Sequence, residues 1–412
     1  MIDKEFLDMF VSSTPDTYCI EVGRGCPFSC TYCCTNTFWR KKFRLKSVQN
    51  IISEIQTIKY KYGFKDFAFE HDLFTCNRDL VVNFCENLKK MKLDITWGCS
   101  ARIDTIDKEL IDIMVDSGLR KIFIGIESGS EFMQKNLKKN LNLDSIIEKI
   151  SYLRQKNVFV TCSFIYGFIQ ETEEDINKTL NLIDKLYSVD VNNIQYHRFR
   201  PFSGTEEFYK CENHLVYELD KINVHVSEIA FIENVSTLII NNMSIFSNFY
   251  TLSTKLIEDI FNLDTYSGLL YILKNYYKVL YHVLKAEFEN DLLNIYYTYK
   301  NIITDSNNRV KSKQNTDNML WEFISDLITC INDISKDVIC KTQNNILSEC
   351  MNLGNDMIKF FKNLSRQTCI FDYNINVVKL QLNPYLSYDQ VDEKITVQMF
   401  KKDHRTYVKR IK

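Results

Sequence analysis

The chain has little glycine and proline, and both are unevenly distributed. Of its 412 residues 11 are Gly and 4 are Pro, and nine of the Gly and three of the Pro lie within residues 1–204. Because these residues mark turns and loops, the first half has the pattern of short elements joined by loops. The second half has the pattern of long helices. We therefore place a change of architecture near residues 205–215.

Long apolar runs and a strong excess of one charge are also absent. No apolar stretch approaches the roughly 18 residues needed to cross a bilayer, and the N-terminus lacks the apolar segment of a signal peptide. The formal net charge of −2 gives no general attraction for nucleic acid or anionic membranes. In a chain with no sign of secretion, the 14 cysteines indicate metal ligands and buried thiols rather than disulfides. We expect a cytoplasmic protein with no membrane association.

Three of the cysteines stand close together in the sequence. Cys26, Cys30 and Cys33 are separated by three and then two residues. A [4Fe–4S] cluster is normally held by four cysteines, so three thiolates leave one iron with an open coordination position for chemistry. The same three thiolates could form most of a structural zinc site that takes a distant Cys or His as its fourth ligand. A second Cys-x-x-Cys pair, which is usual in such zinc sites, is absent.

Apolar segments of two kinds alternate at intervals of about 30 residues up to residue 198. Short strand-like segments are followed by segments with apolar residues at i, i+3, i+4 and i+7, which predict amphipathic helices. This alternation predicts an α/β fold, a partial (β/α)6 TIM-like barrel with a parallel sheet. The predicted strands cover residues 18–22, 66–69, 95–97, 121–126, 159–165 and 193–198.

The predicted domain organisation has three parts. Residues 1–14 form an N-terminal segment, and residues 15–208 form the partial barrel. Residues 209–412 form a mainly α-helical accessory domain that would recognise substrate or act as a lid. Its helical patterns cover about 251–263, 268–303, 316–337 and 342–366, and a short terminal β element is predicted at 375–382 and 394–400.

Polar residues follow every predicted strand of the barrel. Active sites of such barrels lie at the carboxyl ends of the strands, so these residues are expected to share one rim. They are the cysteine loop, Glu70-His71-Asp72, Ser100 with Arg102, Gly125-Ile-Glu-Ser-Gly129, Ser163 with the segment 167–172, and His197 with Arg198 and Arg200.

Two of these motifs together resemble the radical S-adenosylmethionine (radical SAM) enzymes. They are the loop Cys26-Pro-Phe-Ser-Cys30-Thr-Tyr-Cys33, followed by Trp39 and a basic run, and the strand end from Gly125. The resemblance covers roughly residues 15–205 and is greatest to the branch that often follows a cobalamin-binding domain. It implies a [4Fe–4S] cluster, S-adenosylmethionine (SAM) bound at the open iron, and a 5′-deoxyadenosyl radical formed by reductive cleavage of SAM.

The resemblance also implies roles for individual residues. Three cysteines would ligate the cluster, and the other candidates would surround SAM, with acidic groups suited to its ammonium and Arg to its carboxylate. The cluster ligands would be Cys26, Cys30 and Cys33, and the SAM-binding candidates are Tyr32, Glu70, Ser100, Arg102, Gly125, Glu127 and Ser163. Three catalytic candidates stay open: His71 and His197 at strand ends, and Cys369 as a thiol hydrogen donor.

The sequence departs from the family pattern in two ways that affect function. Glu70-His71-Asp72 stands where many members have Gly-Gly-Glu, and the 25 residues before Cys26 contain no cobalamin domain. We therefore expect no methyl transfer through cobalamin, unless that cofactor arrives on another protein.

We expect the enzyme to abstract a hydrogen atom from a peptide or natural-product intermediate, for example in an epimerisation. Such a reaction would make it an oxidoreductase or a transferase. A flavodoxin or ferredoxin would supply the electron, and nucleic acid is not an expected partner. A tRNA-modifying radical SAM enzyme and a zinc-stabilised binding module are the alternatives.

Overall fold

The computed structural model describes residues 17–217, 233–311, 319–342, 351–356, 368–373, 395–402 and 405–410. The predicted N-terminal segment 1–14 lies outside these residues. The chain divides into two compact units, Met1–Phe261 and Asn262–Lys412.

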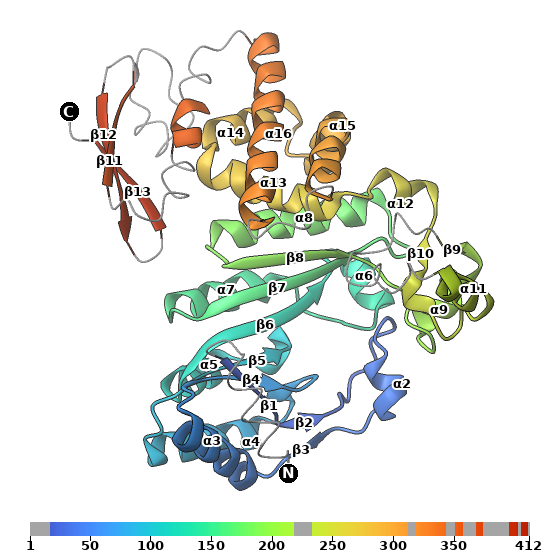
Figure 1. The fold of residues 1–412 in the computed structure, drawn as a ribbon, viewed down its shortest axis with the longest axis vertical. Helices are drawn as coiled ribbons and strands as arrows, with labels where there is room; N and C mark the ends of the chain where they lie inside the picture. The colour runs from blue at the N-terminus through green and yellow to red at the C-terminus, as the bar shows by residue number, and fades with distance from the viewer. Residues whose placement is uncertain are drawn as a thin grey trace. The chain divides into compact units, whose positions relative to one another are not determined.

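A parallel sheet of six strands forms the centre of the first unit. Neighbouring strands follow the chain order, and every pairing is parallel (Figure 1). The first and last strands of this sheet are not paired with each other, so the barrel is open, as predicted. The strands are β1 (Thr17–Glu21), β4 (Asp66–Glu70), β5 (Thr96–Ala101), β6 (Leu119–Glu127), β7 (Phe159–Tyr166) and β8 (Asn193–Arg198).

The helices predicted between the strands are present. Four of them begin at a residue whose side chain accepts a backbone N–H of the first turn, which satisfies a donor that the helix itself leaves unpaired. Thr172 and Asp175 form a reciprocal capping box at the last of them. The helices are α3 (Val48–Tyr62), α4 (Arg78–Met91), α5 (Lys108–Asp116), α7 (Asp144–Gln155) and α8 (Glu173–Ser188).

Several short elements at the carboxyl ends of the strands were not predicted from the sequence. They are too short to show a hydrophobic period. They are β2 (Gly23–Arg24), α2 (Thr35–Trp39), β3 (Arg44–Leu45), η1 (Phe74–Cys76), η2 (Ile103–Thr105), α6 (Glu131–Asn136) and α9 (Glu206–Cys211).

The two faces of the six-stranded sheet differ in how far their side chains are buried. Those on one face are buried, and there Phe69 stacks on Trp97 with ring centroids 5.1 Å apart. On the opposite face Cys19, Glu70 and His197 are exposed. Because side chains of a strand alternate between the two faces, this second face is the concave side of the open barrel.

The first compact unit extends beyond the predicted boundary at residues 208/209. The segment after β8 packs on the barrel instead of starting a separate domain. Phe199, Cys211, Leu252 and Ile257 share one apolar cluster with Phe168 and neighbouring residues of the barrel. The unit therefore also includes η3 (Glu212–His214), β9 (Leu215–Val216), α11 (Glu233–Asn241), η5 (Ser247–Phe249), β10 (Thr251–Leu252) and α12 (Lys255–Asp259).

The second unit is mainly helical, as predicted, but one of the expected helices is divided into three. The pattern at 268–303 predicted one helix and this was wrong: it is divided near Tyr277 and again at Glu289 and Asn290, which have φ of 51° and 66°. None of the described helices has the length and apolarity to span a membrane. The helices are α13 (Leu263–Tyr276), α14 (Lys278–Glu287), α15 (Leu292–Lys311) and α16 (Met319–Thr342).

The terminal β element is an antiparallel sheet. Its strands are β11 (Thr368–Tyr373), β12 (Ile395–Lys402) and β13 (Arg405–Arg410), in that order. The strand predicted at 394–400 is present in β12, whereas the one predicted at 375–382 lies outside the described residues.

Candidate active site at the cysteine loop

The cysteine loop is an excursion of the chain between two short antiparallel strands. Gly23 pairs with Leu45 and Arg24 with Arg44, so the hairpin closes at its base. Gly25 follows with φ of 87°, and a Cβ atom there would overlap the carbonyl oxygen of Lys42. Only glycine permits both this backbone conformation and this close approach.

Asp72 holds the two ends of the loop. Its Oδ2 accepts the Gly25 N–H at 2.7 Å, and its Oδ1 accepts the Thr35 hydroxyl at 3.1 Å. Hydrogen bonds to a charged acceptor are stronger than neutral ones. The carboxylate after β4 therefore positions the segment that contains the three cysteines, a role that the sequence analysis did not assign to it.

His71, a catalytic candidate, is bonded to backbone through both ring nitrogens. Its Nδ1 accepts the Leu73 N–H at 2.7 Å, and Nε2 lies 3.4 Å from the carbonyl oxygen of Arg44. Because Nδ1 accepts, the ring proton is on Nε2 and is donated to Arg44. Burial lowers the pKa of His71, which favours this neutral form. The geometry gives His71 a role in positioning the hairpin.

A pair of glycine variants separates steric contact from backbone strain in the loop. Gly25→Ala is expected to lower the free energy of unfolding by more than the about 1–2 kcal/mol that a left-handed backbone costs alanine, because its Cβ also overlaps Lys42. Gly63 has a similar φ of 81°, but a Cβ atom added there would have no neighbour within 4 Å, so Gly63→Ala is the matched control. Urea denaturation of both variants measures the difference. Equal losses would show that the Lys42 contact has no effect.

Arg102 lies against the cysteine loop in a buried position. Its guanidinium makes a bidentate ion pair with Asp104 at 3.0 and 2.8 Å, and it also donates to the Lys139 carbonyl at 2.7 Å. It stacks on Phe28 at 3.8 Å from the ring centroid, and its Nη1 lies 3.8 Å from Cys30 Sγ. Arg102 therefore brings a positive charge to one of the predicted cluster ligands.

Tyr32, Glu127 and Lys139 form a buried polar network beside the loop. Glu127 Oε1 accepts from Lys139 Nζ at 2.9 Å and from the Tyr32 hydroxyl at 3.0 Å. The Glu127 and Lys139 side chains are each 8% exposed. Burial and the Glu127 charge raise the pKa of Tyr32 well above its ordinary value, so its hydroxyl remains a donor.

The end of β6 has the backbone geometry that this network needs. Glu127 has φ of 71°, and the pairing of β6 with β7 shifts in register between Gly125 and Glu127. A side chain at Gly125 would overlap Glu127 Oε1. Strained backbone at a non-glycine residue is frequent at functional sites, and here it turns the carboxylate of Glu127 back toward Tyr32.

The far side of the loop is held by helix α9. The Thr31 hydroxyl donates to Glu207 Oε1 at 2.7 Å, the Glu207 N–H donates to the Thr31 carbonyl, and Gln170 donates to the second carboxylate oxygen at 3.0 Å. Glu207 is buried. No motif in the sequence signalled this contact, because the two residues are 176 positions apart.

Of the remaining candidates, Gly125 lies directly against Glu127 and Lys139 of this network, and no other of them with a described side chain makes a hydrogen bond or ion pair with it. Glu70 is exposed on the concave face next to Cys19, whose pKa is raised by burial and by the Glu70 charge. Gly125, Ser163 and Gln195 are level with one another on β6, β7 and β8. Ser100 is half-buried one strand earlier, on β5, and His197 is exposed on β8, 3.3 Å from Gln195. Cys369 lies in β11 of the second unit, where side chains are not described.

Glu171, after β7, provides a pH-dependent contribution to stability. Burial raises its pKa from 4.5 to about 8, so the folded protein keeps a proton that the unfolded chain loses. The contribution of this proton to the free energy of unfolding is fully present below pH 4.5. It falls by about 1.4 kcal/mol per pH unit as the pH rises from 4.5 to about 8. Glu171→Gln is expected to remove this slope in urea denaturation, whereas the exposed Glu131→Gln should leave it unchanged. A wild-type stability that is flat over this range would contradict the prediction.

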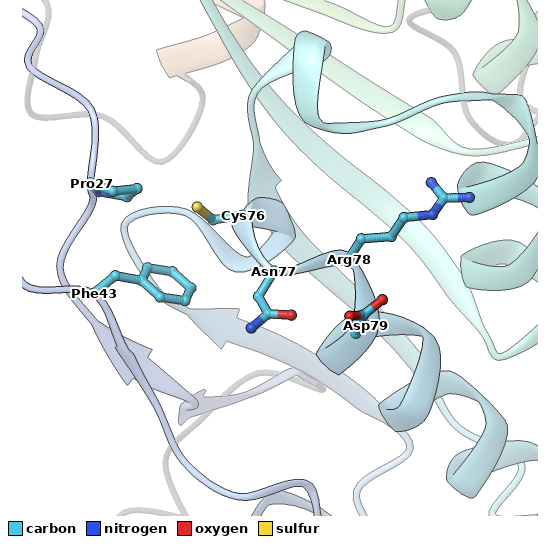
Figure 2. Close-up of a pocket in the computed structure, with 6 residues that line it drawn as sticks. All are labelled: Pro27, Phe43, Cys76, Asn77, Arg78 and Asp79. Atoms are coloured by element: carbon cyan, nitrogen blue, oxygen red, sulfur yellow. The ribbon is translucent and has the colours of Figure 1, made fainter.

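A cavity of about 400 Å³ lies beside the cysteine loop (Figure 2). From the loop side Pro27 and Phe43 line it, and Cys76 faces it from η1. Neither Cys34 nor Cys76 is a fully buried core residue: Cys34 is exposed and Cys76 is half-buried. The other lining residues are Asn77, Arg78 and Asp79.

The donor set of the loop fits a [4Fe–4S] cluster. Thiolates are the usual protein ligands of such clusters, and Cys26, Cys30 and Cys33 are half-buried, with Cys33 near enough to raise the pKa of the other two. Burial raises the pKa of Cys26 to about 11, and Lys139 and Arg102 oppose the same effect of burial at Cys30. Within the described residues, no three His, Cys, Asp or Glu side chains converge on a single metal ion; the thiolates of a [4Fe–4S] cluster do not need to converge, because each binds a different iron.

Comparison with known proteins identifies the family of this part of the chain. Residues 20–183 match the model of the Radical SAM superfamily. This segment is a radical SAM domain. Its superfamily uses a [4Fe–4S] cluster and SAM, which are the two cofactors that the resemblance implies. The matched residues contain the cysteine loop, Arg102 and the Tyr32–Glu127–Lys139 network.

The relatives of the radical SAM domain include methyltransferases. An uncharacterized methyltransferase of Pyrococcus horikoshii is 29% identical over 202 residues, which cover 49% of this chain and 43% of the relative. Cytidylyl-2-hydroxyethylphosphonate methyltransferase of Streptomyces wedmorensis is 27% identical over 217 residues, with coverage of 50% and 41%. The matched part therefore spans less than half the length of each.

Among solved structures, the radical SAM methyltransferase TsrM of Kitasatospora setae, with cobalamin and a [4Fe–4S] cluster bound, is also similar. It is 12% identical, with a TM-score of 0.45, and the match covers 51% of this chain and 40% of TsrM.

Proposed function

We propose that this chain is a radical SAM enzyme that cleaves SAM reductively and abstracts a hydrogen atom from a small-molecule or peptide substrate. The observation that carries the proposal is the position of the three-cysteine loop. It lies at the carboxyl ends of the parallel strands, within a radical SAM domain, and is held there by Asp72, Arg102 and Glu207. When bound, the reduced cluster supplies the electron that cleaves SAM to methionine and the 5′-deoxyadenosyl radical.

The residues of the chain position the cofactors and protect the reaction. Cys26, Cys30 and Cys33 hold three irons and leave the fourth for SAM. Arg102 holds Cys30 in place, and the buried pair of Glu127 and Lys139 fixes Tyr32 beside the same loop. The proposed role of this network is to keep the loop in one conformation when SAM binds.

The concave face of the barrel is the proposed substrate site. It presents polar groups at Glu70 and His197, and Phe123 on the same face is 38% exposed. A surface of mixed polarity suits a peptide or a natural-product intermediate. A tRNA substrate is the weaker candidate, because the chain has a net charge of −2.

Anaerobic reconstitution tests the core of the proposal. The wild-type chain should take up about four iron and four sulfide ions and should form 5′-deoxyadenosine from SAM when dithionite is added. Deuterium-labelled candidate substrates then identify the hydrogen that is abstracted, because the label appears in deoxyadenosine. A colourless, zinc-loaded protein that leaves SAM intact would show that the loop is a structural zinc site.

Methyl transfer is a second candidate function, favoured by the methyltransferases among the relatives. SAM with a fully deuterated methyl group distinguishes the two outcomes. Methyl transfer would place deuterium from that methyl group in the product. Hydrogen abstraction alone would leave all of it in methionine.

A further inference from the structure

The segment that carries the cysteine loop has only positive charges. Between Val22 and Ser47 there is no Asp or Glu, although the whole chain has a net charge of −2. The segment contains six cationic residues, which are Arg24, Arg40, Lys41, Lys42, Arg44 and Lys46. We call this set, together with Phe38 and Trp39, the basic patch.

The basic patch is displayed on the surface by helix α2 and the hairpin of β2 and β3. Figure 1 shows α2 standing out from these two strands. Arg40, Lys41 and Lys42 are exposed, and their side chains make no hydrogen bond or ion pair with the described residues. Arg40 and Lys41 have φ of 52° and 57°, so a tight turn directs the chain here.

An aromatic pair lies at the centre of the basic patch. Phe38 is 73% exposed and packs edge-on against Trp39 with ring centroids 4.6 Å apart. The guanidinium groups of Arg24 and Arg44 lie 5.5 and 5.6 Å from the Trp39 ring. Exposed aromatic residues with arginine are enriched in protein–protein interfaces. A positive rim around them favours an acidic partner and increases its association rate.

We propose that the basic patch is the docking surface of an acidic electron-transfer protein of the flavodoxin or ferredoxin type. This inference rests on the proposed function, which requires one electron from outside the chain. The donor is oxidised by one electron, and the cluster at Cys26, Cys30 and Cys33 is reduced by one. Arg40, Lys41 and Lys42 lie within the same excursion as these cysteines, and Arg24 and Arg44 lie at its base, so a protein bound there lies next to the loop. Small, transient contacts are typical of such redox encounters.

The distribution of charge favours a protein partner over nucleic acid. Nucleic-acid-binding domains usually carry a broad excess of basic residues, whereas this chain has 51 Lys and Arg against 53 Asp and Glu. Its positive charge is concentrated in short stretches, the segment around the loop and residues 401–412, and is not spread over the whole chain. A short surface of this kind matches a small acidic protein better than an extended phosphate backbone.

A charge-removing variant and a matched control test the proposal. The test variant is the triple substitution Arg40→Gln, Lys41→Gln and Lys42→Gln. The control removes three exposed charges at the opposite ends of the strands, with Lys65→Gln, Lys90→Gln and Lys92→Gln. Binding of a bacterial flavodoxin to the reconstituted enzyme is measured by biolayer interferometry at two salt concentrations. Formation of 5′-deoxyadenosine is measured in two assays. One uses flavodoxin with its reductase and NADPH as the electron source, and the other uses dithionite.

The test variant is expected to bind flavodoxin about tenfold more weakly, with a smaller salt dependence, because several exposed ion pairs are lost. Its flavodoxin-driven rate should fall in proportion and its dithionite-driven rate should not change. The control should match wild type throughout. Circular dichroism confirms that both variants are folded, and a charge-reversed triple, Arg40→Glu, Lys41→Glu and Lys42→Glu, should bind more weakly still.

Three results would overturn the proposal. Unchanged flavodoxin binding would show that docking occurs elsewhere. An equal loss of the dithionite-driven rate would assign the basic patch to substrate. Weaker binding of a fluorescent single-stranded RNA with unchanged flavodoxin binding would assign it to nucleic acid. Failure of the wild-type enzyme to cleave SAM with dithionite would instead contradict the proposed function, so the two failures are distinguishable.

Discussion

Replacing Cys30 with serine is expected to reduce 5′-deoxyadenosine formation to background. A serine hydroxyl is a poor ligand for iron compared with a thiolate, and only three cysteines of the loop have the spacing of the motif. Cys30 Sγ also lies 3.8 Å from Nη1 of the Arg102 guanidinium. The same result is expected for Cys26→Ser and Cys33→Ser. Iron and sulfide content after anaerobic reconstitution, together with the visible absorption of the cluster, measures the loss directly.

Cys34 provides the matched control for this experiment. It is adjacent to Cys33 but exposed, and it does not belong to the Cys-x-x-x-Cys-x-x-Cys spacing. Cys34→Ser should keep the cluster and the SAM-cleaving rate. If Cys34→Ser lost the cluster and Cys33→Ser kept it, the assignment of ligands would be wrong.

Lys139→Met is expected to lower the free energy of unfolding by about 3–5 kcal/mol. Methionine has a similar length but no charge, so the Glu127 carboxylate stays buried and keeps the Tyr32 hydroxyl, at 3.0 Å, but loses its cationic partner. An uncompensated buried charge is among the costliest changes that a single substitution makes. Urea denaturation of the protein without cofactors measures the loss, because no cluster is then needed for the comparison.

The double variant Glu127→Gln with Lys139→Met tests whether the unpaired Glu127 charge causes the loss of stability in Lys139→Met. Glutamine keeps an acceptor for Tyr32 and removes the unpaired charge, so the double variant should be more stable than Lys139→Met alone. SAM binding to the same proteins tests a different role. If Glu127→Gln alone kept full stability but lost SAM affinity, the carboxylate would contact SAM directly, as the resemblance implies.

Much of the barrel was predictable because its signals are local. The strands around Phe69 and Ile124 are short apolar runs, and helix α8 is capped by Thr172 and has the acidic first turn that its sequence indicates. The boundary at 208/209 was placed by the change in composition. The chain after β8 nevertheless packs its apolar residues on the barrel, and such tertiary contacts leave no periodic signal in the sequence.

The candidate site was predictable only in part, for a related reason. The three predicted cluster ligands could be identified from the sequence, because cysteines that bind one cluster from a single loop are close together in the sequence. Lys139 looks like a surface residue beside Lys138, and its burial follows from the strained backbone at Glu127, 12 residues earlier. His71 illustrates the opposite case, in which a residue type suited to catalysis has both nitrogens bonded to backbone.

The bond between Thr31 and Glu207 has a consequence for the order of events during biosynthesis. Domains form while the chain emerges from the ribosome, N-terminal part first, and the cysteines emerge long before α9. Closing a loop of 176 residues has an entropic cost that is met only when the whole barrel is assembled. Thr31, and with it the segment that carries Cys26, Cys30 and Cys33, is therefore fixed in place late, once α9 has packed on the barrel.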